Sequence, residues 1–322
     1  MISYLDERTV PERTTDMVVA GVSLYLLFDS QDKISDKIQE LGDIFGKHAY
    51  GITGESENYG PFATVGDAIF FPGDAGELFR VEGTLMQRKT IDQIIRDVCI
   101  KFKLPRIYKR DISDIGSDGN LVYVELDGDK VLLLDYNLSL AGYLHHKGID
   151  YPTDLVTGKS RIFLPKGELS WSIYSDGRLV GELELAKWAV DDREKMFRAQ
   201  IEKKSEAGTC GSNCGDLLFS TFTDGIELYG LTSTGNVWHV DARDSHFIGR
   251  INIDWETGLL FAHNGIEGIV ITEGEIASFS KGQELGTDKL DIPLKDISKI
   301  TMDRDYLYIL IDNRIVRYAI SR

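Results

Sequence analysis

Four residues in the second half of the chain are of types that bind metal ions: Cys210, Cys214, His239 and His246. Cys210 and Cys214 form a C-x3-C pair in a glycine-rich loop, and two thiolates at this spacing supply half of a zinc site or a redox pair. A closed zinc site needs four ligands, but the sequence holds no second C-x2–4-C pair and no H-x3–5-H pair. The four residues are therefore weak candidate metal ligands. Two weakly reactive thiols, or a disulfide, are the alternatives for the cysteines.

The sequence lacks the short motifs that mark several common enzyme and nucleotide-binding sites. It contains no G-x-x-x-x-G-K-[ST], no G-x-G-x-x-G, no G-x-S-x-G and no H-E-x-x-H. The sequence therefore predicts no catalytic residue, no cofactor-binding residue and no cofactor.

The element that must position any site is a strand–turn–strand unit that recurs along the chain. Its clearest copies are 121–135 and 226–241, each with an apolar run, a glycine turn and a second apolar run that ends in aspartate. Such turns between apolar runs are strong hairpin signals. Seven turns, near residues 30, 76, 128, 177, 235, 274 and 313, divide 322 residues into units of about 46.

These repeats resemble the four-stranded blades of the β-propeller superfold, which includes the WD40, NHL and quinoprotein-like groups. The resemblance implies an all-β chain in which residues 1–322 form a single β-propeller of about seven blades, with six and eight also possible. The dipeptide Trp238-His239 is not the Trp-Asp pair of WD40 repeats, so the resemblance carries no family function.

The uneven turn spacing suggests short helical insertions near 31–60, 85–105 and 186–215. In the second insertion, apolar residues recur at helical spacing over 90–102, and Thr90 with Gln93 forms a capping box. In the first, Ile34, Ile38, Leu41 and Phe45 suggest a helical stripe. The run 314–320 is expected to close the ring by pairing with the N-terminal segment, which would remove two exposed sheet edges.

Charge and targeting signals restrict the partner. The chain has 36 Lys and Arg against 52 Asp and Glu, a net charge of −16, which opposes general binding to nucleic acid or to anionic membranes. The first residues lack a secretory signal, and the longest apolar stretch is too short to span a bilayer. We expect a cytoplasmic protein whose partner is another protein with a basic or neutral surface.

Three functions agree with these observations. The first is a non-enzymatic protein–protein interaction scaffold built on the propeller. The second is a virus or phage structural or assembly component, because 90–104 followed by 111–113 resembles a helical element of some phage tail and hub proteins; its location would then be the virion. The third is a propeller enzyme with its site at the central channel.

Overall fold

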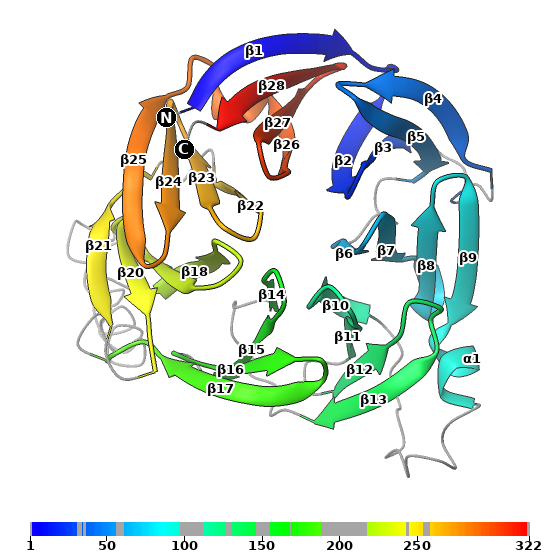
Figure 1. Cartoon of the computed structure of the whole chain (residues 1–322), viewed down its shortest axis with the longest axis horizontal. Helices are drawn as coiled ribbons and strands as arrows, with labels where there is room; N and C mark the ends of the chain where they lie inside the picture. Colours follow the sequence, from blue (N-terminus) through cyan, green and yellow to red (C-terminus); the bar gives the residue numbers. More distant parts are fainter. Residues whose placement is uncertain are drawn as a thin grey trace, which may run out of the picture.

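The chain is a ring of seven four-stranded sheets (Figure 1). The computed structural model describes residues 2–30, 34, 37–55, 61–96, 112–126, 130–145, 155–167, 169–187, 218–242, 245–253 and 258–320. Each sheet is a blade that runs from an inner strand near the axis to an outer strand at the rim. The protein is therefore a seven-bladed β-propeller, and the predicted fold class is confirmed.

Each blade is named by its strands, given from the inner to the outer strand. The first three are β2 (Thr14–Ala20), β3 (Ser23–Asp29), β5 (Lys47–Gly54) and β4 (Gln39–Ile44); β6 (Ala63–Val65), β7 (Ala68–Pro72), β8 (Glu77–Glu82) and β9 (Leu85–Thr90); and β10 (Ile112–Ser117), β11 (Val122–Leu126), β12 (Lys130–Leu134) and β13 (Leu140–His145).

The next three blades are β14 (Val156–Thr157), β15 (Ile162–Gly167), β16 (Ser170–Ser175) and β17 (Arg178–Glu184); β18 (Leu218–Thr223), β19 (Leu228–Thr232), β20 (Asn236–Val240) and β21 (His246–Arg250); and β22 (Leu260–His263), β23 (Gly268–Thr272), β24 (Glu275–Ser280) and β25 (Gln283–Lys289). The closing blade is β26 (Ile297–Met302), β27 (Tyr306–Ile311), β28 (Arg314–Ile320) and β1 (Ile2–Thr9).

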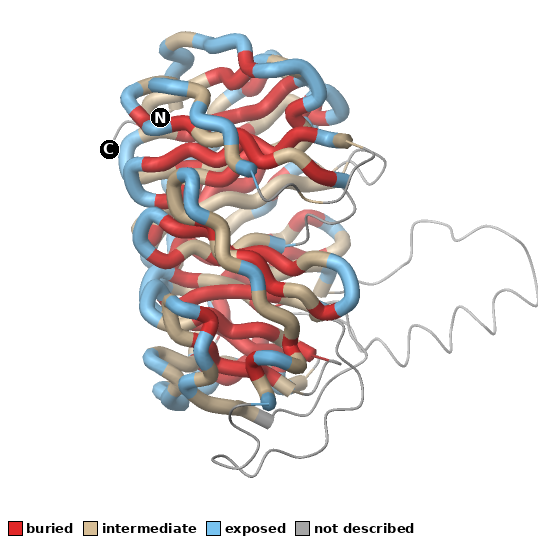
Figure 2. Tube along the Cα trace, turned by 90° about the vertical axis from the view of Figure 1, so that its right-hand side faces the viewer, coloured by how far each residue is buried: buried red, intermediate tan, exposed pale blue. Residues whose placement is uncertain are grey.

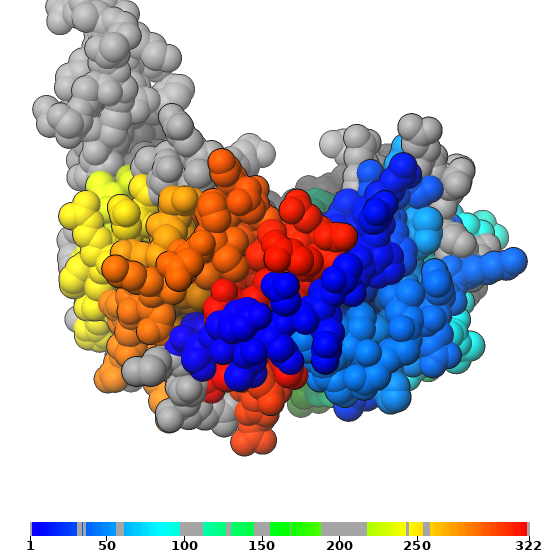
Figure 3. Space-filling view, turned by 90° about the horizontal axis from the view of Figure 1, so that it is seen from above, coloured from blue at the N-terminus to red at the C-terminus, as the bar shows by residue number. Residues whose placement is uncertain are grey.

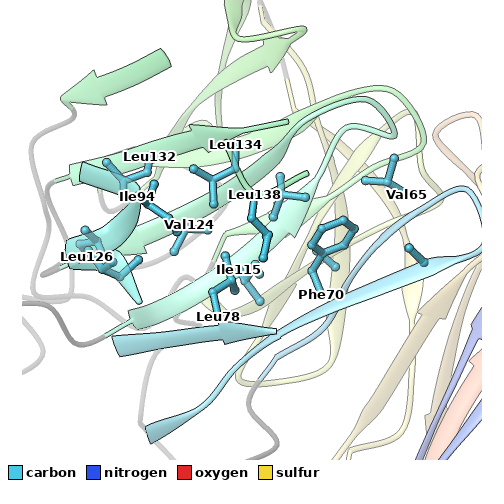
Figure 4. Close-up of a cluster of buried hydrophobic side chains, with 14 residues drawn as sticks. Val65, Phe70, Leu78, Ile94, Ile115, Val124, Leu126, Leu132, Leu134 and Leu138 are labelled. Carbon is cyan, nitrogen blue, oxygen red and sulfur yellow. The ribbon is translucent and has the colours of Figure 1, made fainter. Parts of the chain in front are cut away.

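The core lies between neighbouring blades. Second strands such as β7 and β23 are buried along their whole length because a blade covers each of their faces, whereas outer strands such as β25 are mostly exposed (Figure 2). Figure 4 shows one interblade cluster, in which Phe70 and Leu78 of one blade pack with Ile115, Val124 and other residues of the next. Continuous apolar runs in the sequence therefore correspond to second strands.

The closing blade joins the two ends of the chain. Strand β1 pairs antiparallel with β28, from Ile2 opposite Ile320 to Thr9 opposite Arg314, and the two ends lie side by side in Figure 3. Arg317 adds two hydrogen bonds to the Asp6 carboxylate, at 2.9 and 2.8 Å. The predicted ring closure by 314–320 is confirmed.

The prediction of a helical insertion near 31–60 is wrong for residues 39–44 and 47–54. These residues form the strands β4 and β5, which complete the first blade. Strand β4 takes the outer position before β5 returns between β4 and β3, so β3 and β5 are parallel while the other ladders of the described residues are antiparallel. Leu41 sits in a β-bulge, and Gly46 turns the chain at a φ of 80°. The apolar spacing arises from a bulge and a turn rather than from a helix.

The other two predicted insertions are described only in part. Within 85–105, residues 85–90 belong to the outer strand β9, and the described part of the helix α1 is Ile91–Arg96. The capping box is present: the Thr90 amide donates to Gln93 Oε1 at 2.9 Å, and the Gln93 amide donates to Thr90 Oγ1 at 3.2 Å. Ile91 and Ile94 are buried against the propeller. Residues 97–111 and 188–217 lie outside the described part of the chain.

The seven turns found in the sequence are not all equivalent. Those at 76, 235, 274 and 313 join second to third strands, whereas Gly177 lies between β16 and β17, the third and fourth strands of their blade. The turn near 128 lies outside the described residues. The copy around 177 is therefore shifted by one strand, which accounts for part of the uneven spacing.

Hydrogen-bonded joints tie blades together at the turns between first and second strands. In the Asp118 joint, the Tyr123 hydroxyl donates to Asp118 Oδ2 at 2.7 Å, and the amides of Asp176 and Gly177 in the next blade donate to Asp118 Oδ2 and the Tyr123 hydroxyl, at 2.6 and 2.9 Å. Burial and the neighbouring carboxylate raise the pKa of Tyr123, so the hydroxyl keeps its proton.

The Asp224 joint repeats this geometry two blades further along the chain. The Tyr229 hydroxyl donates to Asp224 Oδ2 at 2.8 Å, while the amides of Lys281 and Gly282 in the next blade donate to Asp224 Oδ2 and the Tyr229 hydroxyl, at 2.8 and 3.0 Å. Asp224 is fully buried, and four groups donate to its carboxylate: the amides of Ile226, Glu227 and Lys281 and the hydroxyl of Tyr229. The joints hold the inner strands in fixed positions around the axis.

Candidate functional site: the central channel

The structure brings His239 and His246 together, but they do not form a metal site with the residues that it describes. They are opposite one another on β20 and β21, with ring centres 6.4 Å apart. His239 Nε2 is 3.1 Å from Glu227 Oε2, and the hydrogen bond from His239 lowers the pKa of Glu227. Cys210 and Cys214 lie outside the described residues, so their role stays a prediction. Within the described ranges, no group of three or more His, Cys, Asp or Glu side chains is placed to hold a metal ion.

The inner strands place polar side chains at equivalent positions near the axis. Four of them contain a β-bulge directly before the same position, which is occupied by Asp16 on β2, Asp114 on β10, Ser220 on β18 and Lys299 on β26. These residues lie near the starts of parallel inner strands, at one face of the ring. We name this face the opening face, and the opposite one, which holds the joints, the turn face.

A cavity of about 640 Å³, the channel pocket, is lined by residues of five blades, those that begin with the inner strands β6, β10, β14, β18 and β22. Figure 1 shows these strands around the axis. This volume is within the range of small-molecule and short-peptide sites. It extends from the Asp114 and Ser220 positions to the ends of β14, β18 and β22. Its lining residues are Pro61, Phe62, Ser113, Asp114, Ile115, Leu155, Val156, Thr157, Ser220, Thr221, Phe222, Thr223, Phe261, Ala262 and His263.

Glycine turns narrow the pocket at the turn face. The Lys159 amide donates to the Gly225 carbonyl at 2.8 Å, and a Cβ atom added to Gly225 would lie 2.3 Å from the Cα of Gly265. Gly225 also has a φ of 101°, which favours glycine. The turns of three neighbouring blades therefore meet directly beyond Thr157, Thr223 and His263, and these three residues form the pocket floor.

The floor presents hydrogen-bond acceptors. His263 is bonded to the backbone of Thr157, and its Nδ1 atom is buried with no hydrogen-bond partner among the described residues. Burial lowers the pKa of His263, although that hydrogen bond and the charge of Asp224 oppose the shift, so the imidazole is neutral at neutral pH and Nδ1 is an acceptor. The Thr223 hydroxyl already donates to the Glu227 carbonyl at 2.6 Å.

The opposite side of the opening face carries an ion pair. Lys299 Nζ is 3.2 Å from Asp16 Oδ2 and 5.7 Å from the centre of the Phe62 ring. Burial raises the pKa of Asp16, while the charge of Lys299 and the amide of Met17 oppose this shift. The molecule thus holds one ammonium group between a carboxylate and an aromatic ring at the pocket's edge.

None of the pocket residues is among the candidate site residues predicted from the sequence. Each blade contributes only a few residues to the lining, and these are far apart along the chain. A signal was nevertheless present, because Thr157, Thr223 and His263 each occupy the last position of an inner strand in three successive repeats. Aligning the repeats on their first turns would have placed these residues in one layer.

None of the described helices is both long and apolar enough to cross a membrane.

Comparison with known proteins identifies the fold of this chain but no family to which it belongs. No family model matches the chain, and no curated protein matches its sequence. Similar solved structures include virginiamycin B lyase from Staphylococcus aureus, at 9% identity and a TM-score of 0.56 over all of both chains. The β-propeller domain of Cps50 (Swd1) from Myceliophteria thermophila is 10% identical, with a TM-score of 0.55 over 98% of this chain and 100% of that one.

A third similar structure is described as YCF48 bound to D1 peptide, at 12% identity and a TM-score of 0.55 over 99% of this chain and 98% of that one. The likeness is one of fold alone. It is shared by a lyase and by a propeller bound to a peptide, so it carries no function by itself.

Proposed function

We propose that this protein is a non-enzymatic protein–protein interaction scaffold that receives a partner at its opening face. The observation that carries the proposal is the channel pocket, which is built by the inner strands of five blades and whose described lining residues include only two ionisable side chains, Asp114 and His263. A rigid ring with a cavity on one face offers a fixed docking surface.

The blade joints support this proposal because they keep the pocket preformed. Asp118 and Asp224 accept amide hydrogen bonds from the adjacent blade, so the inner strands do not need to rearrange on binding. The similar structure of YCF48 with a peptide supports the use of this fold as a peptide receptor. The proposal retains the cytoplasmic location and the basic or neutral partner surface expected from the net charge of −16.

The test is affinity capture from the native host with three forms of the protein. Ser220→Tyr fills the pocket edge without adding charge, and Val22→Tyr places the same ring on the turn face, where Val22 is 58% exposed. We expect a stoichiometric protein partner with the wild type and Val22→Tyr, and its loss with Ser220→Tyr. Equal capture by both variants, or no stoichiometric partner for the wild type, would contradict the proposal.

A further inference from the structure

We propose that the channel pocket binds one basic side chain, a lysine or arginine, carried on an extended segment of the partner protein. The inference rests on the proposed function and names the chemistry that this site selects. Three features of the pocket support it: the charge of the lining, the acceptor at the floor and the apolar walls.

The lining contains no positively charged side chain. Among the fifteen described residues around the cavity there is no lysine and no arginine, and the pKa of His263 is lowered by burial, so its ring is neutral. Asp224 lies directly beyond the floor, fully buried, and its charge acts on His263. The Lys299 ammonium at the pocket's edge is paired with Asp16. A cation entering the pocket therefore meets no unpaired positive charge from the described lining, whereas a carboxylate would enter beside Asp114 and above Asp224.

The floor is suited to a hydrogen-bond donor. Nδ1 of His263 is a buried acceptor without a partner among the described residues, and such an atom costs free energy until a donor reaches it. The Thr223 hydroxyl donates to the Glu227 carbonyl and accepts the Gly225 amide, at 2.6 and 2.8 Å, so it offers no hydrogen to an incoming group. Ammonium and guanidinium groups, which donate and never accept, match this set.

The walls are suited to the methylene stem of a basic side chain. Phe222 and Phe261 stack with ring centres 5.3 Å apart, and Leu155, Val156 and Ala262 complete an apolar wall. Lysine and arginine bury their stems against such surfaces while the charged end meets polar groups. Lys299, whose ammonium lies near the Phe62 ring, is a basic side chain of this chain at an equivalent inner-strand position.

The experiment uses fluorescein-labelled peptides Gly-Ala-Leu-X-Leu-Ala-Gly, in which X is Arg, Lys, Gln or Glu, and measures fluorescence polarisation with the full-length protein. We expect the Arg and Lys peptides to bind at least about tenfold more tightly than the Gln peptide, and the Glu peptide not to bind. Free Nα-acetyl-arginine amide is the competitor that tests for a small-molecule site; displacement of the Arg peptide by equimolar competitor would overturn the proposal of a protein-borne side chain.

Two variants test the site itself. Ser220→Lys places an ammonium at the pocket edge, in the position that Lys299 occupies on β26, and Ser220→Gln is its uncharged control. We expect Ser220→Lys to abolish binding of the Arg peptide and Ser220→Gln to retain most of it. His263→Leu removes the floor acceptor and should weaken binding about tenfold, whereas His263→Gln, which keeps an acceptor oxygen, should weaken it less.

Equal binding of the Arg and Gln peptides, no measurable binding of either, or unchanged binding in Ser220→Lys would overturn the inference. Each of these results is distinguishable from failure of the proposed function. If Ser220→Tyr still prevents partner capture while the peptides show no preference for a basic residue, the scaffold function stands and the basic-side-chain inference falls.

Discussion

The Asp224 joint and the Asp303 joint use the same sequence unit in two different ways. In both, a tyrosine five residues after the aspartate donates to its Oδ2 atom at 2.8 Å. In the Asp224 joint the next blade supplies two backbone amides to the network, whereas in the Asp303 joint it supplies the ammonium group of Lys47, 2.9 Å from Asp303 Oδ2.

Strand order explains the difference. The blade next to Asp303 is the first blade, in which β4 is the outer strand and β5 lies between β4 and β3. Its tight turn therefore joins β4 to β5. The Gly46 amide of that turn donates to Asp43 Oδ1 at 2.9 Å and does not serve the joint. Lys47, the first residue of β5, reaches both Asp303 and the Gly21 carbonyl instead. A charged side chain thus replaces the backbone dipoles where topology has moved the turn.

The largest expected effect is that of Asp224→Ala. The substitution would leave the amides of Ile226, Glu227 and Lys281 and the Tyr229 hydroxyl without their acceptor in a buried position, so we expect a loss of about 4 kcal/mol in the free energy of unfolding. Denaturant unfolding measures it, with the exposed Asp312→Asn as the control. A loss below about 1 kcal/mol would show that the joint does not stabilise the ring.

The turns of the two joints also differ, and Gly225→Ala tests this difference. Gly225 has a φ of 101° and faces the Gly265 backbone, whereas the equivalent residue after Asp303 is Arg304, which has no positive φ. We expect Gly225→Ala to cost about 3 kcal/mol, from strain and from the clash, and Arg304→Ala to cost less than about 0.5 kcal/mol. Thermal unfolding of the two variants makes the comparison, and similar costs would contradict it.

Lys47→Met should cost about 2 kcal/mol at neutral pH, because it leaves a largely buried carboxylate without its cation. Burial alone would raise the pKa of Asp303, but hydrogen bonds from Lys47, the Asp305 amide and Tyr308 hold that pKa below its usual value. The stabilisation is therefore present above about pH 4 and is lost as pH falls through the folded-state pKa.

The stability difference between the wild type and Lys47→Met should accordingly narrow as the pH falls below about 4. Urea unfolding across this pH range measures the difference, and the exposed Lys289→Met is the control for loss of a lysine elsewhere. A gap that stays constant with pH would mean that Lys47 acts through packing rather than through the Asp303 charge.

The smallest effect is expected at the tyrosines. The Tyr25 hydroxyl donates to the backbone carbonyl of Asp67 rather than to a carboxylate, and it accepts the Gly83 amide. Burial raises the pKa of Tyr25 to about 12. A raised folded-state pKa gives stability that is complete below about pH 10 and is lost as pH rises through 12. We expect Tyr25→Phe to cost about 1 kcal/mol at neutral pH.

An alkaline titration of tyrosinate absorbance checks the prediction for Tyr25. The wild type should retain un-ionised tyrosines until it unfolds, and Tyr25→Phe should remove one late-titrating group. Tyr4→Phe, at a side chain that is 57% exposed, is the control for loss of a tyrosine elsewhere in the chain. Loss of an early-titrating group in Tyr25→Phe would contradict the assigned environment.

Much of the fold could be predicted from local sequence because a blade is itself a local structure. The runs at 121–135 and 226–241 form adjacent antiparallel strands with short turns, so the strands and the turn are read from one continuous segment. The Thr90–Gln93 capping box was predicted for the same reason. The first blade could not be predicted in this way, because the spacing of Leu41 and Phe45 agrees with a helix as well as with a bulged strand and a turn.

The sequence by itself determined the all-β class, a propeller of about seven blades and the closure of the ring by 314–320, because apolar runs and glycine turns specify strands and hairpins over short distances. Only the tertiary structure decided which strand takes the outer position in the first blade, that Lys47 serves Asp303, and that His263 faces one pocket with Asp114 and Ser220. These residues come from separate blades, and their proximity depends on how the blades are placed around the axis, which no local pattern encodes.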